Sequence, residues 1–264
     1  TYRGGLCQLK DTKFENYTER EGLDASSINA VCELEKGMLI ATANKLYTLR
    51  DGKVAPKAVN TRIPSAWFKS VTQISDGTIL VSTYSGLLFL YPDGRERLLN
   101  TAEGLPDNQV RMAMQDRDGN IWIGTRAGGA VKLDRQTQEL EVLSKDNGRL
   151  SSNFIMSIDQ DREGNILFGL NDHGLDVLYP DGEVRNYGKE VIGSGLIFNI
   201  HIDQDNAYWV GTNAGLARLS EDGKHQHFTK MDGLGSDVIF DIVEDGSGHF
   251  WLTSSDGLLK ISKK

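Results

Sequence analysis

The sequence contains little of what metal sites and covalent cross-links are made from. Only 2 of its 264 residues are cysteine and only 5 are histidine. Neither cysteine belongs to a C-x-x-C pair or lies at zinc-ligand spacing from a histidine, so the sequence predicts no zinc site. A chain of this length buries enough core to fold without a disulfide. We therefore expect Cys7 and Cys32 to be buried free thiols, with one disulfide as the alternative.

Basic clusters and long apolar runs are also missing. The chain carries 29 Lys and Arg against 37 Asp and Glu, a formal net charge of -8, which argues against nucleic-acid binding. No run of 18 apolar residues is present, so membrane attachment would need segments that this chain does not contain. A signal peptide is lacking as well, but the chain opens in the middle of a repeat, which indicates a piece of a longer protein.

Helical periodicity is absent, and glycine is plentiful instead. Gly or Asp-Gly recurs every 8 to 12 residues among the 29 glycines, and no segment keeps a helical period for three turns. This pattern argues against a solenoid of helical repeats. It favours short strands joined by tight turns, in which glycine supplies the positive φ angle.

A short apolar run recurs six times at intervals of about forty residues. Three copies contain tryptophan, at Trp122, Trp209 and Trp251. Each run follows a turn and another apolar strand, and precedes a third strand and a more polar fourth one. Four short antiparallel strands at this spacing are typical of a β-propeller blade. The six runs are residues 39–42, 79–83, 121–125, 166–170, 208–212 and 250–254.

We therefore predict an all-β fold, a β-propeller of four-stranded antiparallel blades with six repeat units in this chain. It would be a six-bladed ring or most of a seven-bladed one. A single domain or fragment spans residues 1–264, with half a blade in residues 1–18 and repeats that start near residues 22, 62, 104, 148, 191 and 233. In the six-bladed version, residues 14–18 supply the fourth strand of the last blade; in the other version, residues outside the chain supply a seventh blade.

Two phrases accompany the repeats. Glu103–Asn108 reads E-G-L-P-D-N, and Asp118–Thr125 reads D-G-N-I-W-I-G-T. With partial copies such as Asp232–Asp237, they make nearly the whole chain resemble the two-component regulator propeller repeat, and the third copy matches best. The resemblance implies the periplasmic sensor domain of a bacterial inner-membrane regulator, of the hybrid histidine kinase or diguanylate cyclase type. It also implies that the output domain, which would carry any enzymatic activity, is not in this chain.

No catalytic set can be assembled from the sequence around the five histidines. Asp116, Asp118 and Asn120 alternate like the start of a calcium loop, but the bidentate acid that such a loop needs does not follow. We therefore expect hairpin turns, no metal, no cofactor and no enzyme. The alternative is a propeller enzyme of the lyase or lactonase type that uses His201 or His173.

The six copies, aligned on the turn glycine, differ most beside the first strand. One uniformly apolar column is assigned to the core; its members are Ile28, Phe68, Val110, Ile155, Ile197 and Ile239. The next column varies in size and charge; its members are Asn29, Lys69, Arg111, Met156, Phe198 and Phe240. Packing explains a uniform column but not a varied one, and loops on a rigid scaffold carry many binding residues.

The varied columns and the loops after the tryptophan strands predict a mouth with aromatic rings, amides and cations. Such a mouth suits a polar small molecule or an oligosaccharide. Trp67 beside Phe68 is the best single indication. It belongs to the column that precedes the core column, which also varies among the copies; its members are Ser27, Trp67, Gln109, Phe154, Leu196 and Val238. Other predicted partners are the rest of the same sensor protein and a homodimer, and an interaction scaffold without a small ligand is a further alternative. The predicted ligand-binding residues are Trp67, Lys69, Tyr84, Arg111, Arg126, Phe154, Asn171, His173, Phe198, Asn213 and Phe240.

Overall fold

The computed structural model describes residues 5–10, 13–23, 27–63, 67–220 and 222–263. These residues form 25 strands, three short 3-10 turns and one four-residue helix, α1 (Lys189–Ile192). None of the described helices is long and apolar enough to cross a membrane. The prediction of an all-β chain is confirmed. The chain divides into two compact units: unit 1 is residues 1–115 and 134–140, and unit 2 is residues 116–133 and 141–264.

Unit 1 begins with a two-stranded sheet and continues with two four-stranded antiparallel sheets. Strand β11 (Val110–Gln115) also belongs to it and packs against β7 and β8 of the second four-stranded sheet. Strand β2 pairs with β1. That residues 14–18 supply the fourth strand of the last blade stays a prediction. The strands are β1 (Leu6–Lys10), β2 (Lys13–Tyr17), β3 (Ile28–Leu34), β4 (Gly37–Thr42), β5 (Leu46–Arg50), β6 (Lys53–Lys57), β7 (Ser70–Gln73), β8 (Ile79–Thr83), β9 (Gly86–Leu90) and β10 (Glu96–Leu99).

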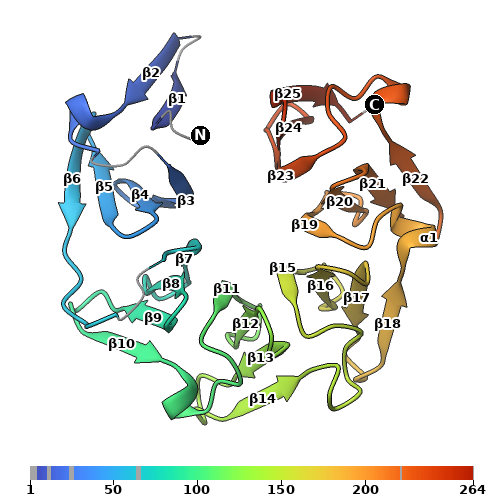
Figure 1. Cartoon of the computed structure of the whole chain (residues 1–264), viewed down its shortest axis with the longest axis horizontal. Helices are drawn as coiled ribbons and strands as arrows, with labels where there is room; N and C mark the ends of the chain where they lie inside the picture. The colour runs from blue at the N-terminus through green and yellow to red at the C-terminus, as the bar shows by residue number, and fades with distance from the viewer. Residues whose placement is uncertain (1–4, 11–12, 24–26, 64–66, 221, 264) are drawn as a thin grey trace. The chain divides into compact units, whose positions relative to one another are not determined.

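Unit 2 contains two complete four-stranded sheets and a last sheet of three strands. Figure 1 shows the strands of each of these sheets side by side in chain order. A further four-stranded sheet, in the order β11-β12-β13-β14, contains the boundary between the units. The strands are β12 (Ile121–Thr125), β13 (Ala130–Leu133), β14 (Leu140–Leu143), β15 (Ile155–Gln160), β16 (Ile166–Leu170), β17 (Leu175–Leu178), β18 (Val184–Tyr187), β19 (Ile197–Ile202), β20 (Tyr208–Thr212), β21 (Gly215–Leu219), β22 (His225–Phe228), β23 (Ile239–Glu244), β24 (His249–Ser254) and β25 (Gly257–Ser262).

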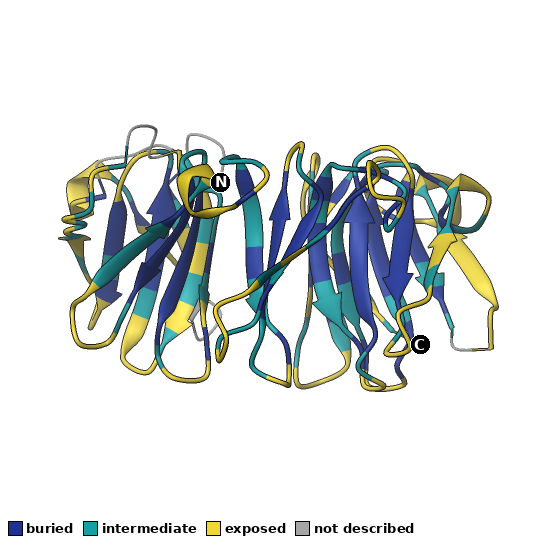
Figure 2. Cartoon of the chain, turned by 90° about the horizontal axis from the view of Figure 1, so that it is seen from below, coloured by how far each residue is buried: buried dark blue, intermediate teal, exposed yellow. Residues whose placement is uncertain are grey.

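The first strands of successive sheets in unit 2 pack against one another, β15 on β19 and β19 on β23. A glycine in the second strand of each of the two four-stranded sheets, β16 and β20, makes this packing close. A Cβ atom at Gly169 would lie 2.6 Å from Ile197 Cγ2, and one at Gly211 would lie 2.9 Å from Ile239 O. Five of the six residues in the predicted apolar column are buried, which confirms their assignment to the core. Figure 2 shows burial running along the strands and exposure concentrated at the turns.

An aspartate holds the turn that precedes each tryptophan strand. Trp122 Nε1 donates a hydrogen bond to Asp116 Oδ2 at 2.9 Å, and Trp209 Nε1 donates to Asp203 Oδ2 at 2.9 Å. Asp116 Oδ1 also accepts the backbone N–H of Asn120 at 2.8 Å. The predicted hairpin turns are confirmed, and both carboxylate oxygens of Asp116, the first residue of the calcium-like pattern, accept hydrogen bonds within the turn.

The two cysteines are both free, as expected, but they are not both buried. Cys32 is half-buried, and its burial raises the pKa of its thiol. Cys7 is exposed, so the prediction of a buried thiol is wrong there. The reason is that Cys7 lies on β1, opposite Asn16 of β2, in a sheet of only two strands.

Candidate functional site

The varied column beside the first strands has a structural cause. The pairing register between the first and second strands shifts between Ile155 and Ser157, and the same shift occurs at residues 28/30, 197/199 and 239/241. Each shift is a β-bulge, in which one residue has no partner in the ladder. The bulged residues are Asn29, Met156, Phe198 and Phe240. They vary because the bulge takes them out of the regular ladder that fixes the core positions.

Three of the predicted residues meet in unit 1, where Trp67, Lys69 and Tyr84 form what we call the mouth cluster. The Trp67 and Tyr84 rings are stacked, with centroids 6.2 Å apart and planes 18° apart. Lys69 Nζ lies 5.4 Å from the Trp67 centroid and 4.8 Å from the Tyr84 centroid. The ladder explains the meeting: the Lys69 N–H donates to Ser82 O at 2.8 Å, so residues just before β7 lie beside those just after β8.

The Lys69 ammonium group is attracted by both rings of the mouth cluster. Among the described residues no carboxylate lies within ion-pair distance of it. Trp67 is 48% exposed, whereas Tyr84 and Lys69 are half-buried. The mouth cluster therefore combines an accessible aromatic surface with a positive charge that no acid in the described part of the chain neutralises. Arg111, the other residue predicted for this unit, is half-buried near the start of β11.

In unit 2, a second group joins Arg126, Phe154 and Asn171. The Arg126 guanidinium lies 5.9 Å from the centroid of the Phe154 ring, close enough for a cation–π contact. The backbone N–H of Asn171 donates to Phe154 O at 3.1 Å. The loop before β15 and the loop after β16 therefore lie side by side, as the predicted mouth requires.

A third group consists of Phe198 and Phe240, whose rings meet edge to face with centroids 5.2 Å apart. Both are bulged residues on neighbouring first strands, and Phe240 is 45% exposed. The other two predicted residues lie in exposed loops of unit 2. Asn213 Oδ1 accepts a hydrogen bond from Ser194 Oγ at 2.5 Å, and His173 Nδ1 lies 2.9 Å from Asp172 Oδ1.

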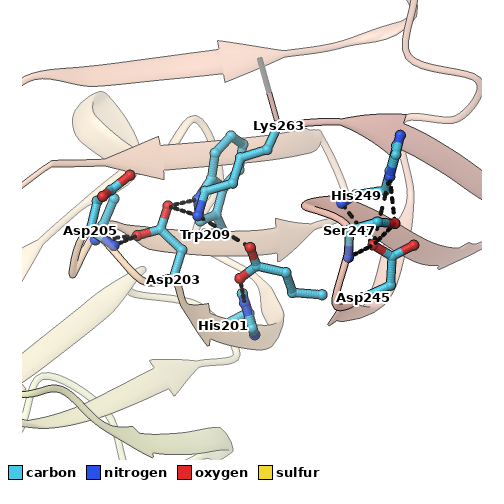
Figure 3. Close-up of polar contacts among 10 residues, drawn as sticks. His201, Asp203, Asp205, Trp209, Asp245, Ser247, His249 and Lys263 are labelled. Carbon is cyan, nitrogen blue, oxygen red and sulfur yellow. Dashed lines mark hydrogen bonds and ion pairs between the residues drawn. The ribbon is translucent and has the colours of Figure 1, made fainter.

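Sequence reasoning missed a polar network, fully buried at Asp203 and partly buried elsewhere, among the turns of the last two sheets (Figure 3). Lys263 Nζ lies 3.0 Å from Asp203 Oδ2 and 3.3 Å from Glu244 Oε1. Glu244 Oε2 in turn lies 3.2 Å from His201 Nε2. We call these four residues the turn network. The position of Asp203, six residues before Trp209, is a signal from which this aspartate could have been found. Nothing in the sequence marks Lys263, which follows the last repeated strand.

Burial and charge act in opposite directions within the turn network. Burial alone would raise the pKa of Asp203, but hydrogen bonds from Trp209 Nε1, the Ala207 N–H and Lys263 outweigh it and hold that pKa below its usual range. Burial alone would lower the pKa of Lys263, but its contacts with Asp203 and Glu244 raise it. Both groups are therefore firmly ionised at neutral pH, and the network is an ion pair extended by a histidine.

The described residues contain no group of three His, Cys, Asp or Glu side chains that could hold a metal ion. His173 beside Asp172 and His201 beside Glu244 are each a histidine with one carboxylate. Such a pair is a component of general acid–base catalysis, which also needs a substrate placed within hydrogen-bond reach.

Comparison with a family model places this architecture among known repeats. Residues 104–127 match the model described as two component regulator propeller. They contain all but the first residue of the two phrases on which the sequence resemblance depends, so the resemblance is confirmed for this repeat. No curated protein sequence matches the chain.

Solved structures give the fold. The extracellular domain of the hybrid two component system BT3049 from B. thetaiotaomicron matches with a TM-score of 0.81 and 18% identity, over 94% of this chain and 35% of that one. The extracellular domain of the one component system BT4673 from the same organism matches with a TM-score of 0.74 and 21% identity, over 90% of this chain and 34% of that one. The fold is a six-bladed β-propeller. The chain spans about a third of the length of these two structures.

Propeller enzymes share the fold as well. Virginiamycin B lyase from Staphylococcus aureus matches the chain with a TM-score of 0.71 and 15% identity, over 90% of this propeller and 84% of the lyase. Identities this low are evidence for architecture, and function has to be argued from the residues of the site.

Proposed function

We propose that this propeller is the ligand-sensing domain of an extracytoplasmic, two-component signalling protein. It binds a polar small molecule or a glycan at its mouth and passes the bound state to an output domain outside this chain. The observation that carries the proposal is the mouth cluster, two stacked aromatic rings with an ammonium group that has no acid partner among the residues that the structure describes. The matched repeat at residues 104–127 and the likeness to extracellular domains of signalling proteins support the same role.

The chemistry of the mouth cluster suits a sugar. The apolar face of a pyranose ring stacks on an exposed indole, and Trp67 offers such a ring. Lys69 donates hydrogen bonds to hydroxyl oxygens, or to a carboxylate or sulfate if the sugar is acidic. The Arg126 and Phe154 contact provides the same combination of a cation and a ring in unit 2. In this proposal the domain acts at the periplasmic side of the inner membrane, and its partner is the remainder of the same protein.

A thermal-shift series with a panel of neutral and acidic oligosaccharides tests the proposal. A ligand that binds only the folded state raises the melting temperature, by an amount that grows with its concentration over Kd. We expect at least one member of the panel to do so, and the replacement Trp67→Ala to abolish the shift. Phe14→Ala is the matched control, because Phe14 is an aromatic residue that is 62% exposed and lies on β2.

The proposal fails if no oligosaccharide of the panel stabilises the protein, or if Trp67→Ala and Phe14→Ala respond equally to the stabilising compound.

A lyase is the second candidate, favoured by the His201–Glu244 pair and by the shared architecture with virginiamycin B lyase. It predicts cleavage of virginiamycin B, detected by mass spectrometry, and loss of that activity in His201→Gln. A wild-type protein that leaves the substrate intact at micromolar concentration over a day rules this candidate out.

A further inference from the structure

The turn network ties the last strand of the chain to two earlier elements. Lys263 follows β25 directly, and its side chain is only 17% exposed. Its two carboxylate partners come from different places: Asp203 lies in the turn after β19, and Glu244 is the last residue of β23. Its backbone N–H also donates to Gly248 O at 3.4 Å. Lys263 thus holds the end of β25 to both neighbouring turns.

This cross-sheet cation is not a general feature of the blade. Asp116, Asp203 and Asp245 each accept a hydrogen bond from the tryptophan six residues later. The cation nearest Asp245 is Lys260, 3.5 Å away on a strand of the same sheet, and it is 42% exposed. Asp203 differs because its side chain is 0% exposed and its cation comes from the following sheet. The blade therefore folds without such a link, and the link at Asp203 is an addition.

The same two strands that meet in the turn network also meet at the mouth. Strand β19 carries Phe198 and His201, and strand β23 carries Phe240 and Glu244. Phe198 contacts Phe240 at one end, and His201 contacts Glu244 toward the other. Three or four residues of extended chain separate the two contacts, roughly 10 to 13 Å at the strand rise of about 3.3 Å per residue. A change in the spacing of β19 and β23 at the mouth therefore reaches the turn network through two stiff strands.

A buried ion pair is well suited to report such a change. Attraction between charges in a poorly hydrated site falls quickly when water enters, and a carboxylate left without its cation is costly to keep buried. A small displacement of Glu244 therefore shifts the balance between two arrangements. In one, Lys263 is bound to both carboxylates; in the other, Lys263 and the end of β25 are separated from them.

We infer that the turn network is a latch that couples the Phe198–Phe240 contact at the mouth to the end of β25. This inference rests on the proposed function, because it assumes that a ligand at the mouth moves these rings. A bound ligand would change the spacing of β19 and β23, and Lys263 would convey that change to the last strand. Lys263 is thus a positioning residue for signalling and takes no part in contacting the ligand.

Hydrogen exchange measured by mass spectrometry tests the latch without any ligand. Phe240→Ala removes the mouth contact, and Val243→Ala is the matched control, since Val243 is a 56% exposed residue on the same strand. We expect Phe240→Ala to speed exchange in the peptide of residues 257–263 by about fivefold or more, and Val243→Ala to change it by less than about twofold. Exchange in β16 and β17 should remain unchanged in both variants.

The decisive measurement is the same comparison in a Lys263→Met background. With the latch already open, Phe240→Ala should no longer speed exchange at residues 257–263, because coupled sites are not additive. Equal fold-changes in the two backgrounds would overturn the inference. If Lys263→Met does not fold, Glu244→Gln serves instead, since it keeps a polar group beside His201 but removes one charge. Because no ligand enters this experiment, a failed latch and a failed ligand proposal remain distinguishable.

Discussion

The sheet formed by β7 to β10 carries two aromatic–cation clusters of nearly the same geometry. One is the mouth cluster, with rings 6.2 Å apart and 18° between planes. The other, which we call the rim cluster, consists of Phe89, Tyr91, Arg95 and Arg97, with its rings 6.1 Å apart and 17° between planes. Ring geometry alone therefore does not distinguish a binding surface from a structural one.

The two clusters differ in what surrounds the cations and rings. In the rim cluster, Arg95 lies 2.7 Å from Asp93 and Arg97 lies 3.2 Å from Glu103, and the Phe89 ring is buried. In the mouth cluster, Lys69 has no such acid among the described residues and Trp67 is half exposed. A cluster that satisfies its own charges stabilises the fold, while one that leaves a charge and a ring available is suited to a ligand.

The largest expected effect separates the two clusters by stability. Phe89→Ala should lower the free energy of unfolding by about 3–5 kcal/mol, because Phe89 is only 3% exposed and its loss leaves a cavity. Trp67→Ala should cost about 1–2 kcal/mol, since half of the residue is already in water. Urea denaturation of both variants checks this. Equal losses would show that the mouth cluster is part of the core.

The next effect concerns Lys263, a cation that, unlike Lys69, forms ion pairs with two carboxylates. Lys263→Met should lower the free energy of unfolding at pH 7 by about 3 kcal/mol, because it leaves Asp203 buried without its cation. The pKa of Asp203 is lowered in the folded state, so its stabilisation is complete above the unfolded value of about 3.9 and is lost as the pH falls through the folded one. The difference in the free energy of unfolding between Lys263→Met and wild type, measured by urea denaturation, should therefore shrink as the pH falls from about 5 to about 2. A difference that is constant over this range would contradict the ion pair.

A smaller effect is expected for Lys69, and it concerns binding. Lys69→Met should lower the melting temperature only slightly without ligand, since it removes weak contacts with two rings and no ion pair among the described residues. It should weaken the binding of an acidic oligosaccharide of the panel by about tenfold, or about 1.4 kcal/mol, and should weaken the binding of a neutral one much less. Isothermal titration of both sugars at low and high salt checks this, because an exposed charge contact weakens with salt. Equal losses for the two sugars would assign Lys69 a role in packing alone.

The smallest effect is expected for Arg95, whose side chain is 76% exposed beside Asp93. Exposed ion pairs contribute little to stability. Arg95→Met should therefore leave both the melting temperature and the oligosaccharide-induced shift unchanged. A lost shift in this variant would mean that the ligand binds at the rim cluster, and the comparison of the two clusters would be reversed.

Much of the candidate site was predictable, because the repeats act as internal controls. Disagreement among the copies selected Trp67, Lys69 and Phe240, and a β-bulge explains why the position of Phe240 is free to vary. The turn network was not predictable. Its cation, Lys263, is brought to Asp203 by the packing of one sheet on the next, and no spacing in the sequence encodes that approach.

The sequence by itself determined the blade. The turn glycines, the alternation of four strands and the aspartate six residues before Trp122, Trp209 and Trp251 are local features, and local features are fixed by short-range sterics and hydrogen bonds. Only the tertiary structure decided which side chains meet. Trp67 stacks on Tyr84 because the ladder aligns two loops, and Lys263 reaches Asp203 because neighbouring sheets pack closely. Such contacts depend on distances between elements, and a repeat sets the elements without setting those distances.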